Sequence, residues 1–177
     1  MATVEERIAA LEEGLAQYQT DLDTVWVLLT ATLVFFMQAG FALVEAGSVQ
    51  QKNITNILLK NVVDVAIGSV VFYLVGFGFA FGDDGDNGFI GDRYFALSDL
   101  NDEDSSQSWA YFFFQFTFAA TSATIVSGSV AERCRMSSYL VYTTAISGFI
   151  YPVVAHCTFA VHSALSSLLE SSHDEGN

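Results

Sequence analysis

The feature that most constrains this chain is an uncharged run from Trp109 to Val130, which ends where Glu132 and Arg133 begin a polar turn. About 20 apolar residues without a charge have the length and composition of a helix that crosses a bilayer. The first half of the run is rich in aromatic residues and the second half in alanine, serine and glycine, which let a neighbouring helix come close. The run therefore predicts a membrane-spanning helix that packs against others.

Three further apolar runs have the same character, and the charged residues are confined to the segments between them. Hydrophobic residues make up 52% of the chain, and such segregation of charge is typical of membrane proteins. We predict an all-α membrane protein with four transmembrane helices in residues 24–159, at about 25–45, 60–82, 109–130 and 136–157.

The composition also excludes several classes of function. The net charge is −14, and the six Lys and Arg residues are too few for a surface that contacts nucleic-acid phosphates. We find no nucleophile elbow, phosphate-binding loop or cluster with metal-ligand spacing in the sequence. We therefore expect neither an enzyme nor a protein with a metal or cofactor.

Residues 1–23 form an acidic head with a regular apolar pattern. Apolar residues recur at alternating steps of four and three, the spacing of a heptad, at Val4, Ile8, Leu11, Leu15, Tyr18 and Leu22. Between two and three heptads are present. We favour a helix that lies on its own protein or at the membrane surface, with a coiled coil as the alternative.

The polar segments predict how the chain is oriented. Basic residues flank the first turn (Lys52, Lys60) and the third (Arg133, Arg135), so both turns are expected on the cytoplasmic side. The acidic connection 83–108 and both termini, including the polar tail 160–177, are then expected outside. Within that connection, the GFIG sequence and residues 94–95 are expected to fold back onto the membrane end.

Three sequence motifs resemble the ammonium transporter (Amt/Mep/Rh) family, and they occur in the family's order and spacing. FQFTFAA followed by GSVAER resembles the family's third span, AGFALVEAGSVQQKN resembles the end of its first span, and YPVVAH resembles the end of its fourth. The resemblance covers residues 21–159. It implies a protein of the plasma membrane whose substrate is ammonium or ammonia, and a tendency to form trimers.

The resemblance also implies residues of a substrate pathway. The position that matches Phe114 helps to form an outer ammonium site, and the position that matches Phe118 closes the pore mouth. Phe159 stands where the family usually has the tryptophan that completes this cage, so we expect weaker recruitment of the cation. Aromatic faces attract cations by about 0.5–2 kcal/mol. The structural alternative is that these rings face lipid or pack between helices.

Polar residues inside the predicted spans need a separate explanation. Glu45 and Asp64 are expected within a turn or two of the cytoplasmic face, with Asp64 at the N-terminal end of its helix, where the helix dipole favours a carboxylate. For both we favour a structural role over a pathway role. Packing is the expected role of Gln115, and a hydrogen bond at a helix end that of His156, with a proton relay as the alternative.

The chain departs from the resembled family in extent. The family has eleven spans in two inverted halves, with the substrate path between the halves, whereas this sequence predicts four. The first hypothesis is a family member, truncated in the sequence, whose activity is ammonium transport. The second is a non-conducting partial subunit that joins full-length transporters as a homo- or hetero-oligomer and modulates them. A third, an unrelated four-span structural protein, predicts that Phe118→Ala leaves ammonium handling unchanged.

Overall fold

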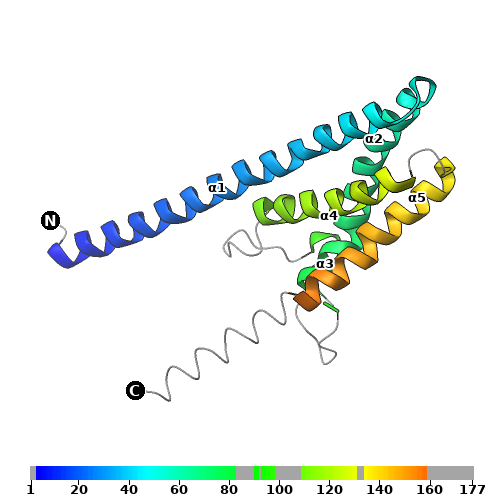
Figure 1. Cartoon of the computed structure of the whole chain (residues 1–177). Helices are drawn as coiled ribbons and strands as arrows, with labels where there is room; N and C mark the ends of the chain where they lie inside the picture. The colour runs from blue at the N-terminus through cyan, green and yellow to red at the C-terminus, as the bar shows by residue number, and fades with distance from the viewer. Residues whose placement is uncertain (1–2, 83–89, 92, 99–108, 131–133, 159–177) are drawn as a thin grey trace, which may run out of the picture.

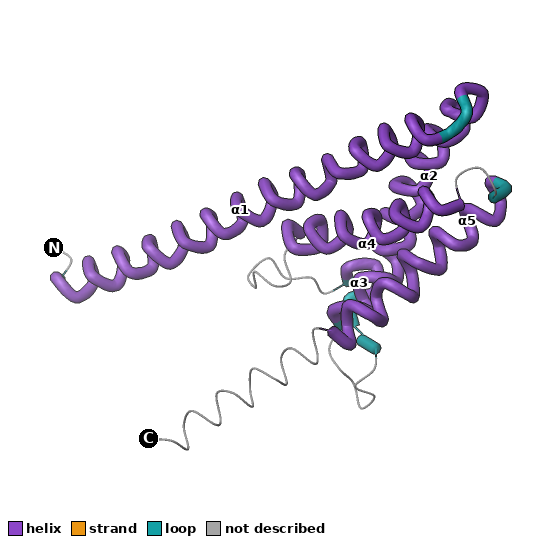
Figure 2. The backbone as a smooth tube through the Cα atoms, viewed as in Figure 1, coloured by secondary structure: helices purple, strands orange, loops and turns teal. Residues whose placement is uncertain are grey.

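The computed structural model of this chain is α-helical in its described residues, which are all except 1–2, 83–89, 92, 99–108, 131–133 and 159–177. The long helices are α1 (Val4–Ser48), α2 (Ile54–Val71), α4 (Trp109–Val130) and α5 (Met136–Ala145), and short helical segments link or extend them. They lie side by side as one bundle (Figure 1), and helical backbone dominates the described chain (Figure 2). The predicted fold class is confirmed.

The acidic head and the first span form one uninterrupted helix, α1, of 45 residues. A capping box starts the helix: the Glu6 backbone N–H donates to the Thr3 hydroxyl at 3.3 Å, and the Thr3 N–H donates to the Glu6 carboxylate at 2.7 Å. The N-terminal half of α1 extends beyond the rest of the bundle (Figure 1). Of the two positions expected for the head, packing on its own protein is not found in the described residues, and a position at the membrane surface stays a prediction.

The second membrane helix begins earlier than the sequence predicted. The turn Gln51–Asn53 (η1) leads directly into α2, which continues through a π-helical turn at Phe72–Gly76 (η2) into α3 (Phe77–Phe81). The apolar run alone suggested a start near residue 60, because Lys52 and three neighbouring amides precede it. Polar residues at a membrane surface do not interrupt a helix, so the helix starts before the apolar run does.

Three helices of the described chain are long and apolar enough to cross a membrane, namely Val4–Ser48, Gln51–Phe81 and Met136–Thr158. The last of these consists of α5, a second π-helical turn at Ile146–Ile150 (η5), and residues 151–158. α4 has 22 residues, none of them charged, and so also has the length of a span. It contacts α1, α2, α3 and α5.

The turn between α1 and α2 lies at the same end of the bundle as the connection between α4 and α5 (Figure 1). The Lys60 ammonium donates a hydrogen bond to the Cys134 carbonyl at 3.1 Å and lies 5.6 Å from the centroid of the Tyr139 ring. Lys60, which follows the first turn, therefore lies against the start of α5, next to Arg135 in the sequence. That end of the bundle is the one predicted to be cytoplasmic.

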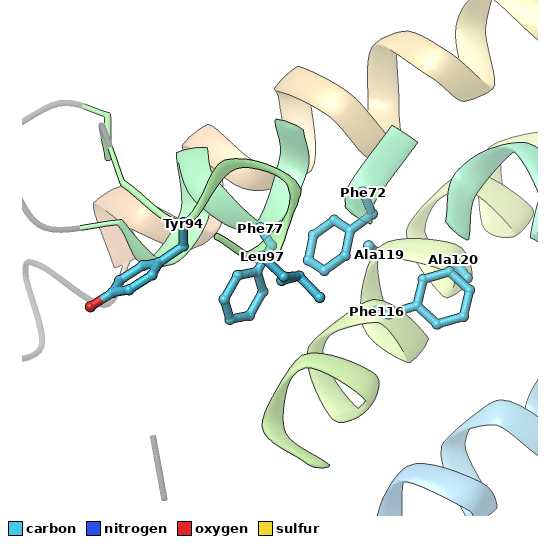
Figure 3. Packing of buried hydrophobic residues seen from close by; sticks show 7 residues of the cluster. All are labelled: Phe72, Phe77, Tyr94, Leu97, Phe116, Ala119 and Ala120. Atoms are coloured by element: carbon cyan, nitrogen blue, oxygen red, sulfur yellow. The ribbon is translucent and has the colours of Figure 1, made fainter. Parts of the chain in front are cut away.

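An aromatic cluster fills the other end of the bundle. Phe72 and Phe77 from the second membrane helix pack with Phe116 of α4, and Tyr94 and Leu97 from the acidic connection complete the cluster (Figure 3). Two of these residues come from a predicted loop. The prediction that this part of the connection folds back onto the membrane end is confirmed.

Two glycines of the second membrane helix, Gly76 and Gly78, allow other parts of the chain to pack directly against its backbone. A Cβ on Gly76 would lie 2.6 Å from the Ser147 carbonyl oxygen, so this position admits only glycine where η2 meets η5. A Cβ on Gly78 would lie 2.7 Å from the Arg93 carbonyl oxygen. Gly76 therefore gives the second membrane helix a small face at its contact with η5. At Gly78 the close neighbour is the folded-back connection and not a helix.

Candidate functional site

The two phenylalanines singled out in the sequence contact each other on α4. The rings of Phe114 and Phe118 are one turn apart, with centroids separated by 5.0 Å and planes at 76°. This edge-to-face arrangement is favourable for aromatic pairs. The two rings are thus neighbours on one side of α4, whereas their contact with a substrate stays a prediction.

The aromatic residues of α4 divide between two faces of the helix. Phe112 and Phe116 pack into the aromatic cluster, with ring centroids 5.9 and 6.4 Å from that of Phe72. Phe114 and Phe118 are offset from Phe116 by two residues, about 200° around a helix. Phe118 is 38% exposed in the described bundle. Phe114 and Phe118 therefore point away from the core that the described helices share. The Phe118 ring is accessible on that side of α4.

The third member of the predicted cage, Phe159, lies outside the described residues. Gln115 is buried beside the aromatic pair, as its predicted packing role requires. His156 is also buried, and its Nδ1 lies 3.1 Å from the Ala80 carbonyl oxygen of α3. His156 thus joins the end of the fourth helix to the end of the second, which is the arrangement expected for a structural hydrogen bond.

A buried polar network joins all four long helices near the centre of the bundle. The Asp64 carboxylate of α2 accepts a hydrogen bond from Thr143 of α5 at 2.6 Å and another from Thr124 of α4 at 3.0 Å. The Thr124 hydroxyl also lies 2.7 Å from Gln38 Oε1 of α1, and the Gln38 amide donates to Thr121 at 3.3 Å. The Thr124 hydroxyl has a single proton to donate, so Asp64 and Gln38 compete for it as acceptors.

The position of Asp64 corrects the sequence-based interpretation. Asp64 lies ten residues beyond Ile54, the first residue of α2, and only 2% of it is exposed. At a rise of 1.5 Å per residue it is about 15 Å from the helix start, and the dipole acts mainly within the first turn. Asp64 therefore does not reach water or cap a helix end. Hydroxyl donors from two other helices stabilise it instead.

A second polar cluster surrounds Glu45 in the last turns of α1. Glu45 Oε2 accepts a hydrogen bond from the Asn61 amide of α2 at 2.8 Å and lies 3.4 Å from the Ser127 hydroxyl of α4. Tyr139 of α5 extends the cluster, since its hydroxyl donates to Ser127 at 3.3 Å. Glu45 lies close to the end of its helix, as predicted. It turns inward, however, and its partners are side chains of neighbouring helices.

The sequence reasoning missed the residues that hold these carboxylates. Thr117, Thr121, Thr124 and Ser127 of α4 recur at steps of four and three, which places them on one side of a helix. This row of hydroxyl residues was the sequence pattern that could have indicated partners for the buried carboxylates. Among the described residues, no group of three or more His, Cys, Asp and Glu side chains gathers in a way that could hold a metal ion. The two clusters are thus built from carboxylates, amides and hydroxyls.

The sequence and the fold both match known transporters. The sequence profile of the Ammonium Transporter Family matches residues 25–176. Ammonium transporter 1 member 3 of Solanum lycopersicum is 47% identical over 151 residues, which are 85% of this chain and 32% of the relative. Ammonium transporter Amt2 of Archaeoglobus fulgidus is 46% identical over 137 residues, 76% of this chain and 28% of the relative. Both relatives carry the name of a transporter and not of an enzyme.

Among solved structures, the Sensor Amt Protein superposes with a TM-score of 0.76 at 41% identity. The match covers 80% of this chain and 35% of that protein's chain. Mep2 of Candida albicans has a TM-score of 0.69 at 22% identity, over 82% of this chain and 33% of its own, which supports the fold alone. This chain spans about a third of the length of the relatives it matches. The four helices, their order and the matched residues 25–176 together establish that the chain belongs to the ammonium transporter family and corresponds to an N-terminal part of it.

Proposed function

We propose that this chain takes part in the transport of ammonium across a membrane. The observation that carries the proposal is the pairing of Phe114 and Phe118 on α4, at a ring distance of 5.0 Å, within a family whose named members are ammonium transporters. Moving an ammonium ion out of water is costly, and aromatic faces recover part of that cost. The substrate is therefore ammonium or ammonia.

The proposed pathway follows the face of α4 that the aromatic core does not use. Phe114 contributes to recruitment of the cation, Phe118 narrows the entrance, and Phe159 supplies the third ring. Gln115 packs beside them. Glu45, Asp64 and His156 serve to hold the helices, because each is buried and is engaged by groups of neighbouring helices. The pathway is then lined by rings and supported by polar contacts behind them.

Growth on limiting ammonium tests the proposal. The chain is expressed alone in cells that lack ammonium transporters, and protease cleavage in the acidic connection, residues 83–108, verifies insertion. Rescue of growth supports transport by this chain, as an oligomer or as a single copy. Failure to grow despite correct insertion, together with no effect on a co-expressed full-length transporter, contradicts the proposal.

Replacing Phe114 by alanine is expected to raise the KM for ammonium about 2- to 30-fold, because a cation–π contact of about 0.5–2 kcal/mol is lost. Uptake of labelled methylammonium in rescued cells measures this change. Phe149→Ala is the matched control, because Phe149 of η5 is exposed and lies away from the aromatic pair in the sequence. Equal KM values for both variants and the unchanged chain would show that Phe114 does not contact the substrate.

The second candidate function is that of a non-conducting subunit that binds full-length transporters and lowers their activity. One observation favours it: an apolar groove on the outside of the bundle, lined by Val70, Tyr73, Leu74 and Phe112, offers a surface for another helix. Co-purification with a full-length transporter, slower uptake in its presence and no uptake by the chain alone would distinguish this function from transport.

The proposed location is the plasma membrane, with both termini outside and the turns at residues 49–53 and 131–135 in the cytoplasm. The contact of Lys60 with the Cys134 carbonyl, which brings the two basic turns to the same end of the bundle, supports this orientation. Protease added to intact cells is expected to cut the acidic connection and to leave both turns uncut. Trimers follow from the family resemblance and are tested by the mass of the purified complex.

A further inference from the structure

We propose that residues 4–22 of α1 form a parallel coiled coil with the same segment of a second copy of this chain. The evidence is an exposed apolar seam. Six residues at heptad spacing lie on the N-terminal half of α1, and all are at least 50% exposed in the described chain: Val4, Ile8, Leu11, Leu15, Tyr18 and Leu22. The inference is independent of what the chain transports.

The heptad register follows from the spacing. Ile8, Leu15 and Leu22 occupy position a, and Val4, Leu11 and Tyr18 occupy position d. In a single helix these apolar side chains are exposed to water, which is unfavourable. Burial against the same side chains of a second helix removes this unfavourable free energy. The capping box at Thr3 and Glu6 stabilises the first turn, so the seam begins at a defined helix start.

The charges beside the seam are complementary for parallel copies. In a parallel coiled coil, position g of one helix lies near position e of the next heptad on its neighbour. Arg7, the one basic residue among residues 1–23, occupies position g, and Glu12 of the partner subunit occupies the facing position e. Gly14 and Asp21, the other g residues, face Gln19 and Trp26 of the partner subunit. No like charges therefore oppose each other, and the surplus acids Glu6 and Glu13 lie at the outermost position, f.

The seam continues along the membrane-spanning half of α1 on the face that points away from the bundle. Leu29, Phe36 and Leu43, which extend position a, are 53%, 75% and 71% exposed. The residues of α1 that are buried against the other helices, Ala31 and Gln38 among them, recur at position c on the other side. A second copy can thus approach the whole seam without displacing any helix of the described bundle.

The membrane and the composition favour a second copy over a lipid surface. Copies inserted with the same topology have parallel α1 helices, as the charge pattern requires. A helix that lies in the lipid interface usually has Lys and Arg on its polar face, whereas the polar face of this segment carries Glu5, Glu6, Glu12 and Glu13 against a single Arg7. The head also continues the axis of the first span, which directs it away from the bilayer (Figure 1).

Disulfide cross-linking of the full chain tests the inference. Cys134 and Cys157 are replaced by serine, and single cysteines are introduced by Leu15→Cys at position a or Glu13→Cys at position f. Both positions are exposed in a single copy. Their cross-linking therefore differs only if two copies pair through the a and d positions. We expect the dimeric product of Leu15→Cys under mild oxidation to exceed that of Glu13→Cys at least about fivefold, because disulfides require close Cβ atoms.

Equal cross-linking at the two positions, or none at Leu15→Cys, would overturn the inference. So would protection of the Leu15→Cys thiol by lipid vesicles in a chain that remains monomeric, because the occupant of the seam would then be the membrane. The number of cross-linked or co-purifying copies reports whether the coil has two strands or three.

A charge exchange tests the parallel register. Arg7→Glu places a glutamate opposite Glu12 of the partner subunit and is expected to lower cross-linking through Leu15→Cys about 1.5- to 5-fold at low salt. Adding Glu12→Arg restores the opposite charges and is expected to restore cross-linking. A double variant that cross-links no better than Arg7→Glu alone would contradict the parallel pairing of these two positions.

Discussion

Replacing Gly76 by valine is expected to lower the free energy of unfolding by about 3 kcal/mol or more, at or above the upper end of the usual overpacking range. A Cβ at this position would lie 2.6 Å from both the Ser147 carbonyl oxygen and Phe72 Cδ2. No rotamer relieves contact of a Cβ with a backbone oxygen, so η2 and η5 must separate. That separation also loosens the aromatic cluster around Phe72. Unfolding in mixed micelles by SDS, followed by tryptophan fluorescence, measures the loss.

Gly40→Val is the matched control for the packing effect. Gly40 lies inside a membrane helix, as Gly76 does, but a Cβ there has nothing within 4 Å. Valine is therefore expected to be nearly neutral at Gly40, where it gains a little over glycine in helix propensity. Similar losses of stability for the two variants would show that the close contact between η2 and η5 is not what limits residue size at Gly76.

The double substitution Thr124→Val and Thr143→Val is expected to cost about 2–4 kcal/mol. Each threonine donates a hydrogen bond to the Asp64 carboxylate, and Thr124 also lies against Gln38. Single hydrogen bonds between membrane helices contribute about 0.6–1.7 kcal/mol, and bonds to charged groups about 1.5–3 kcal/mol. The double variant leaves a carboxylate that is 2% exposed without its two described donors. SDS unfolding again provides the measurement.

Adding Asp64→Leu to the double variant is expected to restore at least half of the lost stability. When the two donors and the carboxylate are all replaced by apolar groups of similar size, the buried charge no longer lacks its donors. Gln38 Oε1 still loses the Thr124 hydroxyl, so the restoration is partial. Thr32→Val serves as the control, because Thr32 is exposed and donates only to the Leu28 carbonyl of its own helix. A triple variant less stable than the double variant would mean that Asp64 has a stabilising partner besides these two hydroxyls.

The membrane helices and the aromatic pair could be predicted from the sequence because both depend on local spacing. Long uncharged runs indicate segments that cross the bilayer. Residues four apart in the sequence, such as Phe114 and Phe118, are neighbours on any helix. The folded-back connection was also predictable, since the GFIG sequence and residues 94–95 are apolar and aromatic residues within a strongly acidic segment. Helix ends were less accurate: the second helix starts at Gln51 and not near residue 60, because a helix continues into the interfacial region where hydropathy no longer reports it.

The partners of the buried carboxylates could not be predicted. Asp64 was placed at a helix start because the apolar run begins close to it, whereas its contacts with Thr124 and Thr143 depend on how three helices are rotated and shifted against each other. A threonine in a membrane helix can also satisfy its hydroxyl on its own backbone, as Thr144 does with the Leu140 carbonyl at 2.9 Å. Which threonines donate to another helix is therefore invisible in a linear pattern.

By itself the sequence determined that this chain is a bundle of membrane helices with an aromatic pair on the third and a heptad seam at its start. Those features follow from hydropathy and from the 3.6-residue period, which act within one helix. Only the tertiary structure decided that the head continues the first span as one helix, that its seam faces away from the bundle, and that Asp64 and Glu45 are held by side chains of other helices. Such facts depend on the relative rotation of helices, which close packing of small residues such as Gly76 sets.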